Sequence, residues 1–427
     1  MHSMHTRLTV ARESRPAAPR FIGTCLADAV HVAVRRHCLS ALVTLFFACA
    51  GEDAGVCGDG ALDPGEACDA AGDGCDDACH LTGSTAWTVI RSDPSTAVSI
   101  LDVAVGASGR IAALGVTSDT SEYGAPWLLA LDPAGAELWR VELPAQGLGP
   151  FPLHVAVDAD DGVYFQGVAV HAFDSRGRSA WDLAPEDAGF LGLAVADDAV
   201  FLASSRGFST GGTFGLRRVD PATGESVWEW TVDDDGKIYI PAALTVAGDD
   251  LVALSYRQAS PADDADPVFV VVDADSGESG AVVVGDPAEV WTNVAGLQAG
   301  DVAITGRRGD DWFVRRLGLD GQVRWTAPLD FHGSEGLADV ACGPDDSIIV
   351  VGDSRGPDGA SVVLQGLVRA LSADGAPAWD AAYAPESPYG FVTARAAAFG
   401  PGSLVIGGRS SDGQSRTVGW IRRIGPK

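Results

Sequence analysis

Two short acidic stretches are the first candidates for chemistry, because carboxylates grouped around a glycine are typical of calcium-binding loops. They are Asp158-Ala-Asp-Asp-Gly162 and Asp233-Asp-Asp-Gly236. An EF-hand loop also needs a glutamate at its twelfth position, and Ala169 stands there after the first stretch. We therefore interpret both stretches as acidic turns and expect no cofactor, with calcium as the alternative.

The chain from residue 83 onward shows no grouping of catalytic residue types. It has three isolated histidines, His154, His171 and His332, and one cysteine, Cys342. The HExxH and GxxxxGK[ST] motifs, which position a zinc ion or a phosphate, are absent from the sequence. We therefore predict no catalytic residue and no enzyme. The alternative is a lyase or hydrolase whose site assembles in a central channel from residues far apart in sequence.

Arginine pairs recur at equivalent places in apolar strands. They are Arg217-Arg218, Arg315-Arg316 and Arg422-Arg423. Because successive side chains of a strand point to opposite faces, one arginine of each pair lies on either face. With so many carboxylates available, we expect ion pairs between neighbouring units. The alternative is a ring of arginines that lines a channel and binds an anion.

Four cysteines lie close together near the N-terminus, at Cys57, Cys68, Cys75 and Cys79. So small a segment cannot bury a core, so we expect two disulfides, with all three pairings open. The alternative is a metal site, for which the gap between Cys75 and Cys79 would serve. The residue order in 57–80 (Cys-Gly-Asp-Gly, Pro-Gly-Glu-Ala-Cys-Asp, Gly-Cys, Cys) resembles the Cys-rich repeats of myxobacterial surface proteins. That resemblance implies a stalk or spacer without chemistry.

Residues 1–50 have the features of a targeting segment. Arg35 and Arg36 precede an apolar stretch from Cys38 to Ala48, which has the length of a signal-peptide core and is too short to cross a bilayer as a helix. The leader before it is unusually long and Arg-rich, so we expect the true translation start to lie downstream of Met1. Export to the periplasm or outer membrane follows, with the cell surface as a further location.

Two cleavage sites compete at the end of the apolar stretch. Phe46-Phe47-Ala48-Cys49 resembles a bacterial lipobox, which implies lipidation of Cys49 and a membrane attachment through that lipid alone. Residues 51–56, acidic and polar, would then be a tether. Ala48-Cys49-Ala50 also fits ordinary signal peptidase, and this cleavage is the alternative.

The charge of the chain is strongly negative and unevenly distributed. The formal net charge is -29, whereas residues 1–50 hold six arginines against Glu13 and Asp28, a net of +4, which leaves -33 for the remainder. Such a surface repels phosphate backbones and excludes nucleic-acid binding. A cationic partner, or solubility alone, explains it.

One hairpin recurs from residue 83 onward: an apolar strand, a turn with Asp and Gly, and a strand with Trp four residues after the Gly. The glycine supplies the positive φ that the turn needs. The copies are Gly135 and Trp139, Gly177 and Trp181, Gly224 and Trp228, Gly321 and Trp325, and Gly375 and Trp379. A degenerate copy keeps Gly277 but has Ala281 at the Trp position.

A second motif of two apolar strands joined by a short turn alternates with the hairpin. It occurs at 103–115, 155–167, 193–204, 244–255, 296–306, 339–352 and 396–408. Together the two motifs give a four-stranded unit, as in a propeller blade. Residues 418–424 supply a first hairpin strand, and Gly83 to Trp87 supply the turn glycine and tryptophan, so the two ends complete a seventh hairpin. We therefore predict an all-β, seven-bladed β-propeller over 83–427, closed by pairing of its N- and C-terminal strands; an open repeat array is the alternative.

The hairpin resembles the tryptophan-docking repeat of pyrroloquinoline-quinone (PQQ)-type propellers, most closely from Asp220 to Trp228. The resemblance implies tryptophans packed between blades and leaves a quinoprotein dehydrogenase or a cofactor-free scaffold. Many such enzymes carry a disulfide between adjacent cysteines beside the quinone, and with Cys342 alone we expect no quinone. We predict a monomeric binding or scaffolding module for an unidentified envelope or extracellular protein. A calcium- or glycan-binding adhesion module is a further alternative, which calcium would stabilise thermally.

Overall fold

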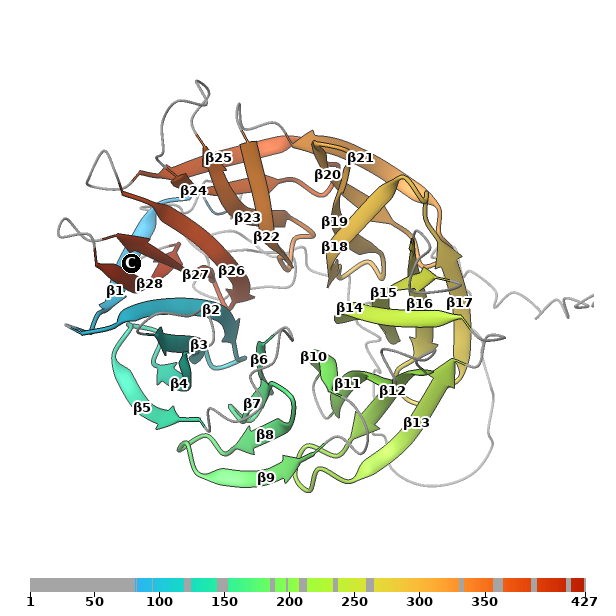
Figure 1. Ribbon diagram of the computed structural model, residues 1–427, viewed down its shortest axis with the longest axis horizontal. Coiled ribbons are helices and arrows are strands. Elements are labelled where there is room, and N and C mark those ends of the chain that lie inside the picture. Colours follow the sequence, from blue (N-terminus) through green and yellow to red (C-terminus); the bar gives the residue numbers. More distant parts are fainter. Residues whose placement is uncertain are drawn as a thin grey trace, which may run out of the picture. The chain divides into compact units, whose positions relative to one another are not determined.

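The described residues form strands β1 to β28, with no helix among them. The computed structural model describes residues 81, 83–93, 95–118, 124–143, 153–184, 189–196, 199–206, 213–232, 237–258, 265–329, 334–355, 364–384, 390–411 and 416–425. The strands group into seven four-stranded antiparallel sheets, which are arranged as blades in a ring (Figure 1). The predicted all-β, seven-bladed propeller is therefore confirmed.

The first three blades follow the chain without interruption. Blade 1 consists of β2 (Ala97–Val105), β3 (Ile111–Ser118), β4 (Ala125–Leu131) and β5 (Glu137–Glu142). Blade 2 consists of β6 (His154–Val157), β7 (Val163–Gln166), β8 (Val170–Phe173) and β9 (Ser179–Leu183). Blade 3 consists of β10 (Phe190–Ala196), β11 (Ala199–Arg206), β12 (Thr213–Val219) and β13 (Ser226–Val232).

The next three blades repeat the same order from the centre outward. Blade 4 consists of β14 (Ile238–Ala247), β15 (Asp250–Gln258), β16 (Asp266–Asp273) and β17 (Ser279–Val284). Blade 5 consists of β18 (Glu289–Gly296), β19 (Val302–Arg308), β20 (Asp311–Leu317) and β21 (Val323–Leu329). Blade 6 consists of β22 (Ser334–Cys342), β23 (Ile348–Arg355), β24 (Leu364–Leu371) and β25 (Pro377–Tyr383).

Blade 7 is built from both ends of the described chain. It consists of β26 (Val392–Gly400), β27 (Ser403–Ser411), β28 (Thr417–Ile424) and β1 (Thr85–Arg91). Strand β1 pairs antiparallel with β28, with Thr85 opposite Ile424 and Ile90 opposite Trp420. The predicted closure by the two ends is therefore confirmed, and it leaves no blade of the ring incomplete.

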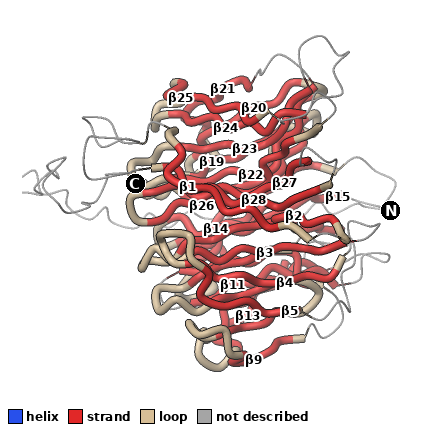
Figure 2. The backbone as a smooth tube through the Cα atoms, turned by 90° about the vertical axis from the view of Figure 1, so that its left-hand side faces the viewer, coloured by secondary structure: helices blue, strands red, loops and turns tan. Residues whose placement is uncertain are grey.

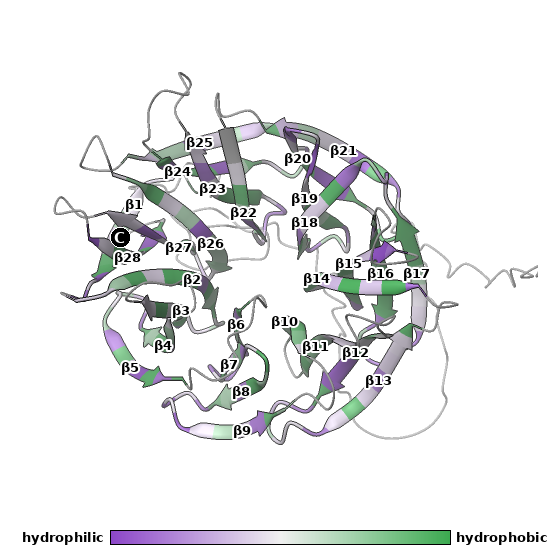
Figure 3. Ribbon diagram, viewed as in Figure 1, coloured by the Kyte–Doolittle hydropathy of each residue, from purple (hydrophilic) through white to green (hydrophobic). Residues whose placement is uncertain are grey.

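The apolar pattern of each strand matches its place in the blade. The second strand β3 is buried on both faces over six consecutive residues, whereas the outermost strand β5 alternates between exposed and half-buried residues. A strand covered on both faces needs a continuous apolar run, and a strand with one wet face needs alternation. Figure 3 shows this difference as apolar inner strands and mixed outer strands.

The hydrophobic core is divided among the junctions between blades. Each of the seven buried apolar clusters joins two neighbouring blades, for example Leu114 of blade 1 with Phe165 of blade 2. The ring is thus held together by side-by-side packing of blades, and what fills each junction determines how tightly two blades are joined.

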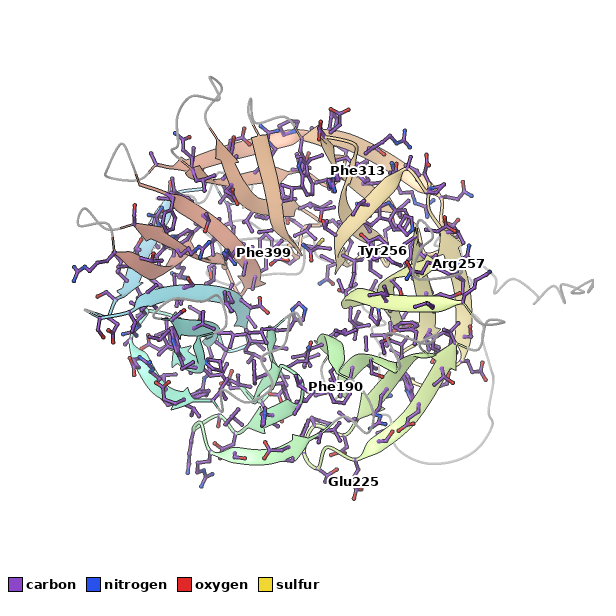
Figure 4. All side chains as sticks on the ribbon, viewed as in Figure 1. Phe190, Glu225, Tyr256, Arg257, Phe313 and Phe399 are labelled. Atoms are coloured by element: carbon purple, nitrogen blue, oxygen red, sulfur yellow. The ribbon has the colours of Figure 1, made fainter. Side chains whose placement is uncertain are left out.

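The described turns between first and second strands and between third and fourth strands gather on one side of the ring (Figure 2). We call this side the turn face. It carries the repeated glycine turns, among them Gly135 and Gly177. Figure 4 shows how the radial position varies: Phe190 and Phe399 lie toward the centre, whereas Glu225 lies at the periphery.

Candidate functional site

The repeated tryptophans lie at the junctions between blades, each against the turn glycine of the next blade. A Cβ placed on Gly177 would come 2.6 Å from Trp139, and one on Gly224 would come 2.7 Å from Trp181. These turn glycines also have positive φ, such as 77° at Gly177. Only glycine satisfies both the turn and the indole that lies on it.

Five of the six docked indoles also donate a hydrogen bond across the junction. The Nε1 atoms donate to turn carbonyls of the next blade, Trp87 to Pro133 (3.1 Å), Trp139 to Ser175 (3.2 Å), Trp181 to Pro221 (2.8 Å), Trp228 to Ala274 (3.1 Å) and Trp325 to Ala373 (2.9 Å). The repeat residues found in the sequence are therefore the contacts that join one blade to the next.

In the degenerate hairpin of blade 4, a different residue of the same strand covers the turn glycine of blade 5. Ala281 occupies the Trp position, and it is too small to reach the next turn. Val283, two residues further along and on the same face, instead covers Gly321, where a Cβ would come within 2.8 Å of it. The alternation of strand side chains explains why the replacement lies two residues away.

A second cross-junction contact involves a long polar side chain on the turn face. In blade 5, Arg316 binds Asp301 of its own blade (2.9 Å) and Asp346 of blade 6 (3.1 Å), and it donates to the carbonyl of Ala373 (3.1 Å). The side chain of Arg316 is only 12% exposed. This arginine fills the junction and links two blades electrostatically.

Other junctions are filled in related ways. In blade 3, Arg218 binds Asp275 of blade 4 at 2.8 Å. In blade 1, Arg110, just before the second strand, donates to the Ser175 carbonyl of blade 2 and lies 3.6 Å from Asp161. In blade 2, the hydroxyl of Tyr164 donates to Asp158 of its own blade (2.6 Å) and lies 3.4 Å from the Pro221 carbonyl of blade 3. The expected ion pairs between blades are therefore present.

The other arginine of the first two pairs binds within its own blade, whereas Arg422 of blade 7 contacts blade 6. Arg217 pairs with Glu229 at 2.7 Å, and Arg315 binds both oxygens of Glu289, at 2.8 and 2.9 Å. Arg422 lies 4.0 Å above the ring of Tyr383. All three pairs lie on third strands (β12, β20, β28), so the alternative of an arginine ring around the central axis is wrong.

Glu289 was not predicted from the sequence, although its side chain is only 1% exposed. Burial raises its pKa, but hydrogen bonds from Arg315 and Trp291 outweigh burial, so the net pKa is lowered. Arg308 completes the cluster at 2.9 Å. Since every partner is a donor or a cation, the cluster stabilises blade 5 and holds an ionised carboxylate.

The junction between blades 6 and 7 differs from that between blades 5 and 6, because small residues occupy the positions that blade 5 fills. Blades 1 and 2 also have alanine, Ala130 and Ala172, at the Arg316 position, but there a longer side chain crosses the junction from elsewhere in the blade. Ala370 pairs with Trp379 as Arg316 pairs with Trp325. Likewise Ala378 corresponds to Arg324, and Ser347, just before β23, corresponds to Asp301, just before β19. A cavity of about 630 Å³ lies there. We call it the junction cavity.

The lining of the junction cavity is mostly apolar, with a few carboxylates and hydroxyls. Its residues are Leu81, Asp345, Ser347, Ile349, Ala370, Leu371, Ser372, Ala373, Asp374, Ala378, Trp379 and Phe399. Asp374 and Ala378 are exposed, so the cavity reaches the surface at the turn face. This size and mixture are typical of small-ligand sites.

Trp379 differs from the five tryptophans that donate across their junctions. Its ring lies against Gly83 as expected, at 2.7 Å from a Cβ placed there. Its Nε1, however, has no hydrogen-bond partner among the described residues, in contrast to Trp325 at the preceding junction. The indole of Trp379 therefore borders the junction cavity without a cross-junction hydrogen bond to any of the described residues.

A polar cluster lies near the axis of the ring, on innermost strands. Seven positions are equivalent by strand register: Asp102, His154, Gly192, Ala243, Asn293, Asp339 and Ala396. A register irregularity precedes six of them, all but His154. We call these positions the axial residues.

The two axial aspartates bridge neighbouring blades in the same way. Asp102 accepts the N–H of Val103 (2.8 Å) and that of Val155 in blade 2 (2.9 Å). Asp339 accepts the N–H of Val340 (2.8 Å) and that of Ala397 in blade 7 (3.0 Å). Both carboxylates therefore have a structural role, because each oxygen is already used by a backbone donor.

Burial and mutual repulsion shift the pKa values of the axial groups. Burial, with the charge of Asp102, raises the pKa of Asp339 to about 7. Burial lowers the pKa of His154, but its contact with Asp102 (3.5 Å) and the nearby charge of Asp339 outweigh burial and raise it. The cluster thus holds protons near neutral pH, and its sequence positions gave no motif that would predict it.

The remaining predicted residues have ordinary structural roles where they are described. The Asp158 carboxylate accepts the N–H groups of Asp160 (3.0 Å) and Gly162 (2.6 Å), as in an acidic turn. His171 lies 2.6 Å from Asp182 in its own blade. Burial raises the pKa of the Cys342 thiol, so the thiol stays protonated. Predictions outside the described residues concern Cys49, Cys57, Cys68, Cys75, Cys79, His332 and the stretch 233–236.

The described residues contain neither a candidate metal-binding cluster nor a candidate membrane-spanning helix. No cluster of three or more His, Cys, Asp or Glu side chains that could hold a metal ion occurs among them. Nor does this part of the chain contain a helix long and apolar enough to cross a membrane.

Comparison with known proteins shows the fold alone. No family model and no curated protein matches the chain. Among solved structures, it resembles a chain of the mitotic checkpoint complex (TM-score 0.51, 12% identity, 81% of this chain and 96% of the other). The Dos1 propeller (TM-score 0.48, 11% identity, 79% and 95%) and a protein of unknown function from Bacteroides caccae (TM-score 0.41, 11% identity, 67% and 94%) are more distant.

Proposed function

We propose that this protein is an exported binding module of the cell envelope, attached by a lipid at Cys49, and that it has no catalytic activity of its own. The single observation that carries the binding function is the junction cavity. It lies where blade 5 has a filling side chain, and it combines an apolar lining with Asp345, Asp374 and the indole of Trp379, whose Nε1 has no partner among the described residues. A β-propeller is in general suited to binding or scaffolding.

The axial cluster is the site that an enzyme of this fold would be expected to use. Its carboxylates, Asp102 and Asp339, already accept backbone N–H groups from two blades. A general base must be within reach of a substrate proton, and these oxygens are committed to joining strands. This arrangement supports the assignment of the axial cluster to stability and of the junction cavity to binding.

The export part of the proposal rests on the apolar segment and on the lipobox-like residues before Cys49. The Trp-docking contacts in turn support a relationship to PQQ-like repeat propellers without the quinone. The spacer role of 57–80, with disulfides among its four cysteines, completes the proposed organisation of a membrane anchor, a stalk and a binding domain.

Two measurements test the proposal. Metabolic labelling with a fatty acid should label the wild-type chain and leave Cys49→Ser unlabelled; equal labelling of the two, or no label in either, would contradict the anchor. Affinity capture from envelope extracts should retain a partner on the wild-type propeller. The partner should be lost when the junction cavity is filled by Ala370→Arg, Ser347→Asp, and retained on a propeller carrying the distant Val323→Arg. Retention by the filled variant would contradict the cavity as the binding site.

A further inference from the structure

The repeat itself indicates what the junction cavity accepts. At the preceding junction, the equivalent space contains the side chain of Arg316, which lies between two carboxylates and a turn carbonyl. Blades 1 and 3 use Arg110 and Arg218 in corresponding contacts. A guanidinium is therefore the group that this kind of junction holds when the chain supplies one.

The junction cavity keeps acceptors although it lacks the arginine. Asp374 lies in the turn of blade 6, where hydrogen bonds, first from Ser372, lower its pKa and keep it ionised. Asp345 also lines the cavity, and its Oδ1 accepts the N–H of Ser347 at 3.1 Å. Two carboxylates without a cation among the described ion pairs face a space bordered by alanines, so the local charge favours a cationic ligand.

The apolar lining extends beyond what a guanidinium would contact. Leu81, Ile349 and Phe399 border the cavity along with the indole of Trp379. A planar guanidinium stacks on aromatic rings, and an apolar neighbour would fill the rest of the volume of about 630 Å³. The ligand with the best match is thus an arginine beside an apolar residue in one short segment.

We propose that the junction cavity binds an arginine side chain of a partner protein, together with an adjacent apolar side chain, in place of the arginine that blade 5 supplies internally. This inference rests on the proposed binding function and identifies the chemistry of the partner. The net charge of -33 outside residues 1–50 adds a long-range attraction for a cationic segment.

The test uses blocked dipeptides and calorimetry on the full chain. Acetyl-leucyl-arginine amide should bind, and its citrulline analogue, which has the same shape without the charge, should bind at least tenfold more weakly. The double variant Ala370→Arg, Ser347→Asp rebuilds the blade 5 arrangement and should abolish binding with an unchanged circular dichroism spectrum. Val323→Arg adds one positive charge on the exposed outer strand of blade 5 and should leave the affinity unchanged.

A second pair of variants covers the case in which the double variant does not fold. Asp374→Asn should weaken the arginine dipeptide at least fivefold, whereas Asp320→Asn, in the equivalent turn of blade 5, should not change it. Equal affinity for arginine and citrulline peptides, or unchanged binding to the filled variant, would overturn the proposal. Free agmatine binding as tightly as the dipeptide would also overturn it, in favour of a small guanidine. If the cavity-filled variant still captures an envelope protein, the junction cavity is not the binding site. The protein would then bind that partner through another surface.

Discussion

The two junctions that flank blade 6 are built from the same repeat, but one is filled by side chains and the other contains a cavity. Between blades 5 and 6, Arg316 connects Asp301, Asp346 and a turn carbonyl, and Trp325 donates to that same carbonyl of Ala373. Between blades 6 and 7, Ala370 leaves a cavity, and the indole N–H of Trp379 has no partner in the described part of the chain. The difference shows that one repeat position can serve either cohesion or binding, depending on the side chain it carries.

The largest effect should come from removing the docked indoles. We expect Trp325→Ala to lower the free energy of unfolding by about 3 kcal/mol, because a large half-buried ring and its hydrogen bond are both lost. Trp379→Ala should cost about 2 kcal/mol, because the ring already borders a cavity and makes no such bond. Urea unfolding followed by circular dichroism measures both, and equal losses would remove the proposed difference between the junctions.

A smaller effect should follow from removing the filling arginine. Arg316→Ala leaves the carboxylates of Asp301 and Asp346 facing each other, each 15% exposed, so we expect a loss of about 2 kcal/mol in unfolding free energy. Arg324→Ala is the matched control, since its side chain is 44% exposed and its longer ion pair with Asp301 (3.4 Å) should contribute about 0.5 kcal/mol. Similar losses in the two variants would contradict the filling role of Arg316.

The smallest effect concerns the axial residues, where blade 6 has Asp339 and blade 5 has Asn293. The folded pKa of Asp339 is raised to about 7 from 3.8, so the folded protein keeps a proton that the unfolded chain releases. Its contribution to stability is therefore complete below pH 4 and is lost as the pH rises toward 7. Asp339→Asn should remove this decline. It also removes one of the two side-chain oxygens that accept backbone N–H groups, so the unfolding free energy at pH 8 should change by only about 1 kcal/mol.

The measurement for the axial residues is urea unfolding of both proteins at pH 4, 5.5 and 8. The difference between variant and wild type should move in favour of the variant as the pH rises. Asn293→Asp is the matched control, because it places another carboxylate in the ring and should steepen the decline. A pH-independent difference would show that Asp339 is ionised throughout this range in the folded protein.

Most of the architecture could be predicted from the sequence, because its determinants are local and repeated. The glycine and tryptophan of each hairpin are four residues apart, and the incomplete copies at Gly83 and at 418–424 indicated closure without any knowledge of the structure. Such spacing reflects turn geometry and strand alternation, which act over a few residues.

The sites could not be predicted in the same way, because they depend on what is missing or on long-range register. Ala370 and Ala378 are unremarkable residues in their hairpin, and only their alignment with Arg316 and Arg324 reveals an unfilled space. Asp102 and Asp339 lie 237 residues apart in sequence and act as equivalents only because six inner strands have a register irregularity at the same place. The residue types and their order along the chain do not show which positions on the inner strands are equivalent.

Closure of the ring by β1 and β28 has a consequence for how the protein folds. Strand β1 is the first of the fold to be synthesised, yet its partner is the last, with Thr85 opposite Ile424. Closing so long a loop costs conformational entropy, which the pairing of β1 with β28 must offset. Contacts between residues so far apart in sequence also slow folding. Blades 1 to 6 can form in order during translation, whereas the ring closes only after β28 has been synthesised. A polypeptide that stops before Thr417 would therefore keep the edges of β1 and β27 unpaired and open to association with other chains.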